Sequence, residues 1–252
     1  MGGAGGAANS GSSAQSGAGG GAIPWEPVET PWCGEGWVGL DDHTCFFAPD
    51  SVGPSASLVI FLHGMMQPDS LPQGMQNTAR TAADTQGFVV LFPRGHQGLC
   101  GWDPSVEPYW CWPTSRVNVD AYALEFTSEW LASEALLESV LDISFDRRFV
   151  IGFSNGGYFA SYVGLEGLLP TSGAGVVAAG RSYVDASLLS PHHPPFYIAV
   201  GAMDSQPIQD SAQNLALALA QHDWPRTFVR HMDRGHEIRV DDMNAAWTTW
   251  NR

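Results

Sequence analysis

Uninterrupted apolar segments, separated by stretches with helical periodicity, limit more than any other feature what this chain can fold into. Three of them read SLVIFLH at 57–63, FVVLF at 88–92 and FYIAV at 196–200. A strand without a polar face must be covered on both sides, which is typical of a parallel sheet packed between helices. The pattern therefore predicts an α/β fold with a mostly parallel central sheet and helices on both faces.

The rest of the chain continues this alternation. Further strands are predicted at 148–153, 174–179 and 227–231, a short hairpin at 36–47, and helices at 77–86, 118–141, 155–165, 208–221 and 237–250. No internal repeat is visible in this order of elements. We therefore predict one folded domain over residues 23–252.

Residues 1–22 have a different composition, because 19 of these 22 residues are Gly, Ala or Ser. Such a segment buries too little to offset the entropy of ordering it, so we predict a flexible linker. No basic-then-apolar stretch precedes it, and we expect any signal or anchor to lie outside this chain.

The charge balance excludes several classes of partner. The chain has 11 Lys and Arg residues against 26 Asp and Glu residues, a net charge of −15. Binding of nucleic acid or of anionic lipid needs clustered positive charge. No stretch reaches the roughly 18 uninterrupted apolar residues of a membrane span. We therefore expect no nucleic-acid partner, no membrane span and a monomeric globular protein.

The four cysteines form two neighbouring pairs along the sequence, Cys33 with Cys45 and Cys100 with Cys111. Disulfides between these neighbours would close two short loops, each worth about 3 kcal/mol in the chain-entropy model. Four free thiols are the alternative, whereas metal binding is disfavoured because no CxxC or spaced histidine accompanies them. Disulfides imply an oxidising compartment, so we expect a secreted or extracytoplasmic protein.

A candidate nucleophile lies where one predicted strand meets the next helix. The segment Gly152-Phe153-Ser154-Asn155-Gly156 fits G-x-S-x-G and follows the apolar residues FVI at 149–151. In this strand–turn–helix setting only glycine fits beside the serine, and the turn lifts the hydroxyl above the sheet edge. A glycine-rich turn with a serine N-cap is the alternative. We predict that Ser154 is the nucleophile.

A serine hydroxyl needs a base, which follows the serine and the acid in chain order when this turn is catalytic. The histidines after Ser154 are His192, His193, His222, His231 and His236. Of these, His236 alone follows the last strand and precedes the last helix, at the sheet edge where ligands bind in α/β folds. We predict His236 as the general base.

The acid must orient that imidazole and stabilise its positive charge. Asp204 comes directly after the strand 196–200, on the same sheet edge. Asp210 falls inside the next predicted helix, Asp185 lies one connection too early, and Asp233 is too close to His236 along the chain to face it. We predict Asp204 as the acid, with a helix N-cap as its alternative role.

Acyl transfer also needs two N–H groups that bind the oxyanion. The residue after the nucleophile, Asn155, supplies one, and the loop His63-Gly64-Met65-Met66-Gln67 after an early strand supplies the other. We assign the second donor to Met65, with Met66 as the alternative. We interpret His63 as structural and not catalytic, and we place it among the residues that line the substrate-binding site.

Together these motifs resemble the α/β-hydrolase superfamily: LHG after an early strand, GFSNGG at the turn, an Asp after the next-to-last strand, and GHE before the last helix. The HG-x-x-Gln loop with GFSNGG is most similar to secreted polyhydroxybutyrate-depolymerase-like and feruloyl-esterase-like serine hydrolases. The resemblance implies a catalytic domain without a separate lid domain, and a serine esterase without cofactor or metal. The helix after the turn departs from that group by continuing YFASYV, which bears on the subsites.

Aromatic residues crowd the loop 98–116. Trp102, Trp110 and Trp112 lie in and beside the segment between Cys100 and Cys111. Aromatic faces offer large apolar contact area at a low entropy cost, so these tryptophans are assigned to a substrate platform. Packing of the same side chains against the body of the protein is the alternative.

The sequence thus predicts a secreted carboxylic-ester hydrolase with a Ser-His-Asp triad and an acyl-enzyme. Its expected substrates are polymeric or aromatic esters, namely polyhydroxyalkanoate or another polyester, feruloyl esters or acetylated polysaccharides. A serine peptidase of the same fold and an inactive polymer-binding module are the alternatives.

Overall fold

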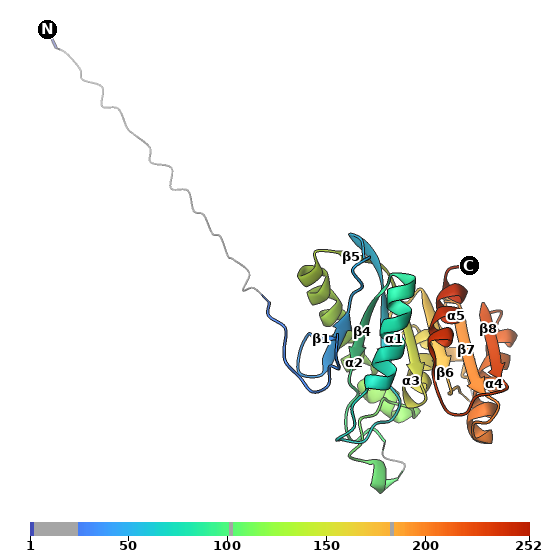
Figure 1. Cartoon of the computed structure of the whole chain (residues 1–252). Coiled ribbons are helices and arrows are strands. Elements are labelled where there is room, and N and C mark those ends of the chain that lie inside the picture. Colours follow the sequence, from blue (N-terminus) through green and yellow to red (C-terminus); the bar gives the residue numbers. More distant parts are fainter. Residues whose placement is uncertain (3–24, 101–102, 182–183) are drawn as a thin grey trace.

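The computed structural model describes residues 1–2, 25–100, 103–181 and 184–252 (Figure 1). Most of the predicted linker at 1–22 therefore lies outside the described residues, and so does Trp102. Within the described part, no helix is both long and apolar enough to cross a bilayer.

The described chain forms one eight-stranded sheet in the order β1-β2-β4-β3-β5-β6-β7-β8. In chain order the strands are Val38–Gly39 (β1), Thr44–Phe47 (β2), Ser55–Leu62 (β3), Val89–Pro93 (β4), Ser144–Phe153 (β5), Gly173–Val177 (β6), Phe196–Gly201 (β7) and Arg226–His231 (β8). Pairing is antiparallel from β1 through β2 to β4 and parallel from β4 onward. The predicted mostly parallel sheet is confirmed.

Helices cover both faces of the sheet, as the apolar strands require. They are Gln73–Gln86 (α1), Arg116–Leu141 (α2), Asn155–Glu166 (α3), Gln206–Gln221 (α4) and Val240–Trp250 (α5), with short 3-10 turns at Pro104–Val106 and Ala186–Leu188. The helices α1 and α5 pack side by side on one face, and α2, α3 and α4 pack on the other (Figure 1). Successive residues of β3 show this division directly. Val59 packs in the core on the α1 and α5 face, and Ile60 packs in the core on the face covered by α2, α3 and α4.

Several boundaries differ from the sequence prediction: α1 begins at Gln73 and not at 77, and β6 ends at Val177 and not at 179. The strand β5 begins at Ser144 instead of 148, because its polar first half still pairs with β3, Ser144 opposite Ser55. Apolar content does not reveal that half, which lies at the exposed end of the sheet. The last helix begins at Val240 and not at 237, since the Asp242 carboxylate accepts the Arg239 N–H at 2.9 Å and caps the helix there.

Two disulfides fasten the loops beside the sheet. Cys33 pairs with Cys45 and Cys100 with Cys111, at Cα separations of 5.5 Å and 5.8 Å, which is the local pairing that the sequence predicts. The first joins the segment before β1 to β2. The second closes the loop after β4, whose residue Cys111 exchanges two backbone hydrogen bonds with His96.

Removal of the first disulfide is expected to destabilise the fold without changing its architecture. A Cys33→Ala/Cys45→Ala double variant should lose about 3 kcal/mol of unfolding free energy, because its unfolded chain gains the freedom of an unclosed loop. Urea unfolding followed by tryptophan fluorescence measures this loss. The matched comparison is a Cys100→Ala/Cys111→Ala variant, which opens a loop of similar length. If the Cys33→Ala/Cys45→Ala variant is as stable as the parent, the prediction is contradicted.

Candidate active site

Ser154 occupies a backbone conformation that side chains rarely adopt. It stands between β5 and α3 with φ 52° and ψ −120°. Its N–H donates to the Val177 carbonyl of β6 at 2.8 Å, and its own carbonyl accepts the Tyr158 N–H at 3.1 Å. Strain of this kind costs on the order of 1–3 kcal/mol and persists only where the surroundings fix it, as they do here at a candidate nucleophile.

Glycines beside Ser154 make the turn possible. A Cβ on Gly152 would collide with the backbone of Gly156, and a Cβ on Gly156 would collide with the Leu62 carbonyl at the end of β3. The first turn of α3 therefore packs directly against the sheet. This close approach carries the serine hydroxyl to the carboxyl ends of the central strands.

Three side chains far apart in the sequence meet at this edge. His236 Nε2 lies 2.8 Å from Ser154 Oγ, and His236 Nδ1 lies 2.8 Å from Asp204 Oδ2. The other Asp204 oxygen accepts the Ser205 N–H at 2.7 Å. With Nδ1 protonated, the ring donates to the carboxylate and leaves Nε2 to accept the serine proton.

The acid of these three contacting side chains is buried, whereas the imidazole is accessible to solvent. The Asp204 side chain is 3% exposed, whereas that of His236 is 39% exposed. Phe153 packs against the imidazole with ring centroids 5.0 Å apart. The carboxylate is thus fixed inside the protein while the hydroxyl and the imidazole face solvent, where a substrate can reach them.

The other candidate acids and bases have different roles. His192 Nε2 contacts the Thr171 carbonyl, His193 stacks on Trp224, and His222 ends α4. The Asp185 carboxylate caps a 3-10 turn, and that of Asp210 accepts from Gln206 within α4. The structure brings neither these groups nor His231 to Ser154.

A network around Asp242, which sequence reasoning missed, fixes the loop that carries His236. The buried Asp242 carboxylate accepts from the Tyr197 hydroxyl at 3.0 Å, from Arg234 Nη1 at 3.0 Å and from the Arg239 N–H at 2.9 Å, and it lies 2.9 Å from His231 Nε2. Burial, followed by the nearby Asp242 charge, raises the pKa of Tyr197. The sequence signal was Arg234, two residues before His236, but the Asp242 that it binds lies in α5 and has its further partners in β7 and β8.

The two residues predicted to bind an oxyanion, Met65 and Asn155, line a cavity beside Ser154. The cavity of about 330 Å³ is lined by Met65, Thr114, Ser154, Asn155 and Tyr158. Among the hydrogen bonds of the described residues, none uses the N–H of Met65 or of Asn155. The Asn155 side chain is occupied, because its Oδ1 accepts the Trp112 N–H at 2.7 Å. The arrangement leaves both N–H groups for an oxyanion.

The substrate-binding role assigned to His63 and Trp112 is wrong, because both side chains are fully buried. His63 Nε2 accepts the Gly95 N–H at 2.9 Å, and its Nδ1–H donates to the Gly64 carbonyl. Trp112 Nε1 donates to the His63 carbonyl at 2.9 Å. Since the Gly64 carbonyl and the Met65 N–H belong to one planar peptide, His63 fixes the direction of the Met65 donor.

Trp110 is half-buried and lies beside the loop 63–67. Its role in substrate binding stays a prediction. Its backbone exchanges two hydrogen bonds with Met66, at 2.8 Å and 3.1 Å. The Arg94 guanidinium lies 4.2 Å from the centre of its ring and covers one of its faces. Trp110 can therefore offer a substrate only part of its surface.

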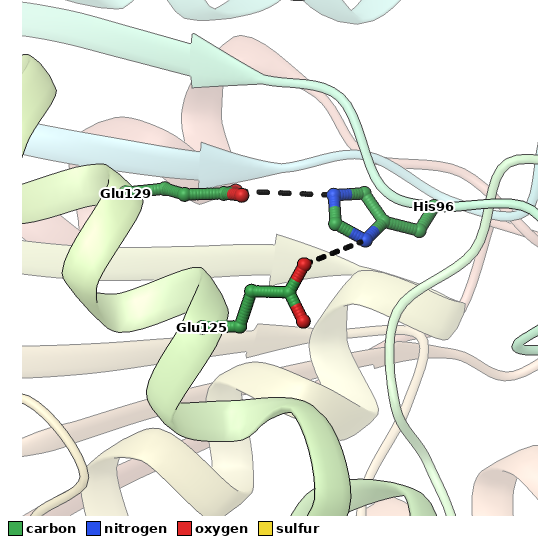
Figure 2. Close-up of side chains that lie close together, drawn as sticks. All are labelled: His96, Glu125 and Glu129. Atoms are coloured by element: carbon green, nitrogen blue, oxygen red, sulfur yellow. Dashed lines mark ion pairs between the residues drawn. The ribbon is translucent and has the colours of Figure 1, made fainter.

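A second cluster of titratable groups lies away from Ser154 (Figure 2). One nitrogen or oxygen atom from each of His96, Glu125 and Glu129 lies within 4.8 Å of the others. However, the nearest contacts join Nδ1 to Glu125 at 3.9 Å and Nε2 to Glu129 at 3.8 Å, on opposite edges of the ring. Burial raises the pKa of Glu129. This geometry is that of ion pairs between α2 and the loop after β4, and we assign no metal to it.

Comparison with known proteins identifies the fold. No protein-family model matches the chain. Solved structures similar to it include the esterase PE8, with a TM-score of 0.59 and 19% identity over 82% of this chain and 96% of that one. The carboxylesterase of Bacillus cereus has a TM-score of 0.58 and 17% identity over 82% of this chain and 92% of that one. The chain has the α/β-hydrolase fold.

One curated relative matches part of the chain. It is the bifunctional acetylxylan esterase/xylanase XynS20E of Neocallimastix patriciarum, which is 27% identical over 151 residues. The match covers 58% of this chain and 20% of that protein, so it spans only about a fifth of the relative's length.

The buried His63 predicts an acid-sensitive fold. Burial lowers the pKa of His63 from 6.5 to about 4. Between these values the unfolded chain binds more protons at this residue than the folded chain does, so stability falls as the pH falls. The displacement of the pKa corresponds to about 3 kcal/mol lost between about pH 7 and pH 4.

Urea unfolding across that range tests this contribution against a His63→Asn variant. The variant should be less stable at neutral pH and should lose less stability on acidification than the parent. A His43→Asn variant, whose side chain is 44% exposed in the parent, is the control and should retain the parent's acid response. Parallel pH profiles for the parent and His63→Asn would contradict the assignment.

Proposed function

We propose that this protein is a carboxylic-ester hydrolase that works through an acyl-enzyme. The observation that carries the proposal is the unbroken contact chain from Asp204 through His236 to Ser154 Oγ, with both distances 2.8 Å. The esterases among its structural neighbours and the acetylxylan esterase relative support the same reaction class.

The reaction has two halves. His236 Nε2 takes the proton of Ser154 as Oγ attacks the ester carbonyl, while the N–H groups of Asn155 and Met65 donate to the oxyanion. Protonated His236 then gives this proton to the leaving alkoxide, and the acyl-enzyme remains. A water molecule, deprotonated by the same imidazole, attacks the acyl carbon, and collapse of that intermediate returns the proton to Ser154 Oγ.

The substrates we propose are esters on polymers or aromatic groups, and the exposure of the site supports this class. Met65 beside the cavity is 40% exposed and His236 is 39% exposed, so an ester on a long chain can reach Ser154. The two disulfides support a secreted or extracytoplasmic location, where such polymers occur.

Replacement of the nucleophile tests the proposal most directly. Ser154→Ala should lower kcat/KM for p-nitrophenyl acetate by about 10⁴-fold or more, because the remaining groups cannot form the acyl-enzyme. A fluorophosphonate probe should label the parent and not the variant. Ser139→Ala, at an exposed position on α2, is the control and should retain full activity. Undiminished hydrolysis by Ser154→Ala would contradict the proposal.

Chelation separates this mechanism from a metal-dependent one. Every proposed step uses Ser154, His236, Asp204 and two backbone N–H groups, so dialysis against EDTA should leave kcat/KM unchanged. Loss of activity that added Zn²⁺ restores would contradict the mechanism. That result would make the cluster of His96, Glu125 and Glu129 the candidate metal site.

A further inference from the structure

A second cavity lies beside the one at Ser154. It has a volume of about 450 Å³, and its walls include Thr114, Arg116, Tyr158, Tyr162, Arg181 and Asp185. Thr114 and Tyr158 line both cavities, so the two adjoin each other at these residues. Tyr158 is one helical turn beyond Ser154 on α3, with its N–H on the Ser154 carbonyl at 3.1 Å. The two cavities together thus offer room beside Ser154 for a substrate larger than its ester group.

We propose that the second cavity is the subsite for an uncharged sugar unit of the substrate. The inference rests on the proposed esterase function and narrows it to esters carried by neutral carbohydrate. Its basis is the charge balance of the cavity wall and the kind of hydrogen-bonding groups that the wall presents.

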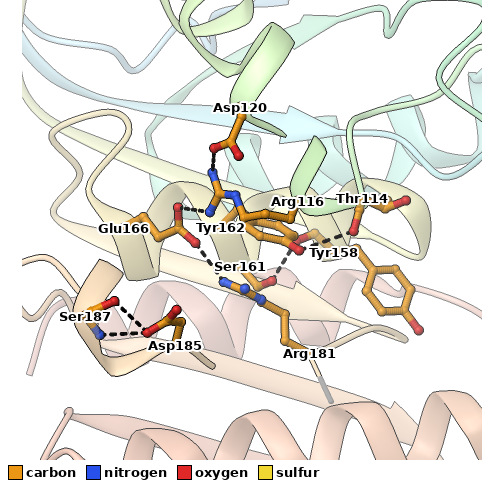
Figure 3. A network of polar contacts seen from close by, with 10 residues as sticks. All are labelled: Thr114, Arg116, Asp120, Tyr158, Ser161, Tyr162, Glu166, Arg181, Asp185 and Ser187. Carbon is orange, nitrogen blue, oxygen red and sulfur yellow. Dashed lines mark hydrogen bonds and ion pairs between the residues drawn. The ribbon is translucent and has the colours of Figure 1, made fainter. Parts of the chain in front are cut away.

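The wall of this cavity is charged but balanced. Arg116 Nη1 and Arg181 Nη1 bind the two oxygens of Glu166 at 2.6 Å and 3.1 Å (Figure 3). The side chains of Glu166 and Arg181 are 7% and 9% exposed, and Arg116 also pairs with Asp120. Two arginines thus face two paired carboxylates, and Asp185 adds a third. The cavity has no surplus positive charge with which to bind an anion.

Stacking makes this wall rigid. The Arg181 guanidinium lies 3.7 Å from the centre of the Tyr162 ring, and the Arg116 guanidinium lies 5.6 Å from it. The Tyr162 hydroxyl donates to the Thr114 carbonyl at 3.4 Å. The groups that would meet a ligand are therefore held in place before it arrives, which lowers the entropy cost of binding.

Both donors and acceptors remain available on this wall. A guanidinium has five N–H donors, and among the described residues Arg181 uses one group, Nη1, for its side-chain hydrogen bond to Glu166. The Asp185 carboxylate accepts the Ser187 N–H and hydroxyl through Oδ1, and no described donor contacts its Oδ2.

This combination of groups distinguishes between ligand classes. A sugar hydroxyl both donates and accepts, so it can satisfy an arginine N–H and the Asp185 oxygen together. A polyester segment offers ester carbonyls to the arginines but no donor to Asp185, whose desolvated oxygen would stay without a partner at a cost of about 1–3 kcal/mol. A carboxylate or phosphate would satisfy the arginines but would lie against Asp185 and Glu166. Neutral carbohydrate is the class that fits.

The test compares two substrates in each variant, an acetylated neutral xylo-oligosaccharide and p-nitrophenyl acetate. Arg181→Gln and Asp185→Asn should each lower the ratio of the first kcat/KM to the second by about tenfold, mainly through a higher KM for the oligosaccharide. Arg147→Gln, at the opposite end of β5 from Ser154, should leave both values unchanged. Thermal unfolding checks that each variant is folded, and Asp185→Asn carries the test if the buried Arg181 cannot be replaced.

Other outcomes overturn the subsite. Equal losses on both substrates would show a structural role, and an unchanged ratio would show that the sugar does not enter the cavity. The variants can also be assayed on a hydroxybutyrate trimer and on a uronate ester. If kcat/KM for either of these falls more than kcat/KM for the oligosaccharide, the cavity binds a polyester or an anionic ligand and not a neutral sugar. Failure of the proposed function is seen separately, since the parent would then hydrolyse neither ester. Calorimetric binding of the unacetylated oligosaccharide to Ser154→Ala would still report on the cavity.

Discussion

The positive φ of Ser154 is the constraint on which the rest of this structure depends. A chain that leaves β5 and enters α3 within one residue must turn sharply, and the turn is possible because α3 approaches the sheet over Gly152 and Gly156. The same turn exposes Oγ, leaves the Asn155 N–H without an intrahelical partner and puts Tyr158 beside the proposed nucleophile. Burial of both faces of β5 stabilises the fold enough to hold this strain.

The position of His236, the proposed base, has a different physical origin. His236 lies on a loop between β8 and α5, and its side chain is 39% exposed. A buried ion pair between Arg234, on the same loop, and Asp242 of α5 holds this loop in place. Removing two charges from water is costly, and here the Tyr197 hydroxyl and the Arg239 N–H supply further partners for the carboxylate. Such a network specifies one geometry, which is what proton transfer over 2.8 Å requires.

The sequence was informative wherever local pattern and function coincide. Apolar runs predicted the strands, the glycines around Ser154 predicted the turn, and the ends of the last two parallel strands led to Asp204 and His236. It failed where the outcome depends on how loops pack. Nothing in the loop 98–116 indicates that Trp112 faces the core while Trp110 stays half-buried. The Arg181–Glu166 pair joins residues 15 apart with no periodic signal between them.

Charge distribution links the site to the kind of surface on which it can work. All 11 basic residues are Arg, and several of them, including Arg116, Arg181 and Arg234, are paired with carboxylates inside or along the walls of the fold. A guanidinium suits these positions because its planar fork binds carboxylates and stacks on tyrosine rings. The 26 acidic residues then dominate the outer field, and a net charge of −15 repels polyanions over about 8 Å at physiological salt. A protein that uses its arginines internally in this way approaches uncharged surfaces without an electrostatic penalty. The balanced charge of the cavity beside Ser154 extends the same preference to the single sugar unit that it would hold.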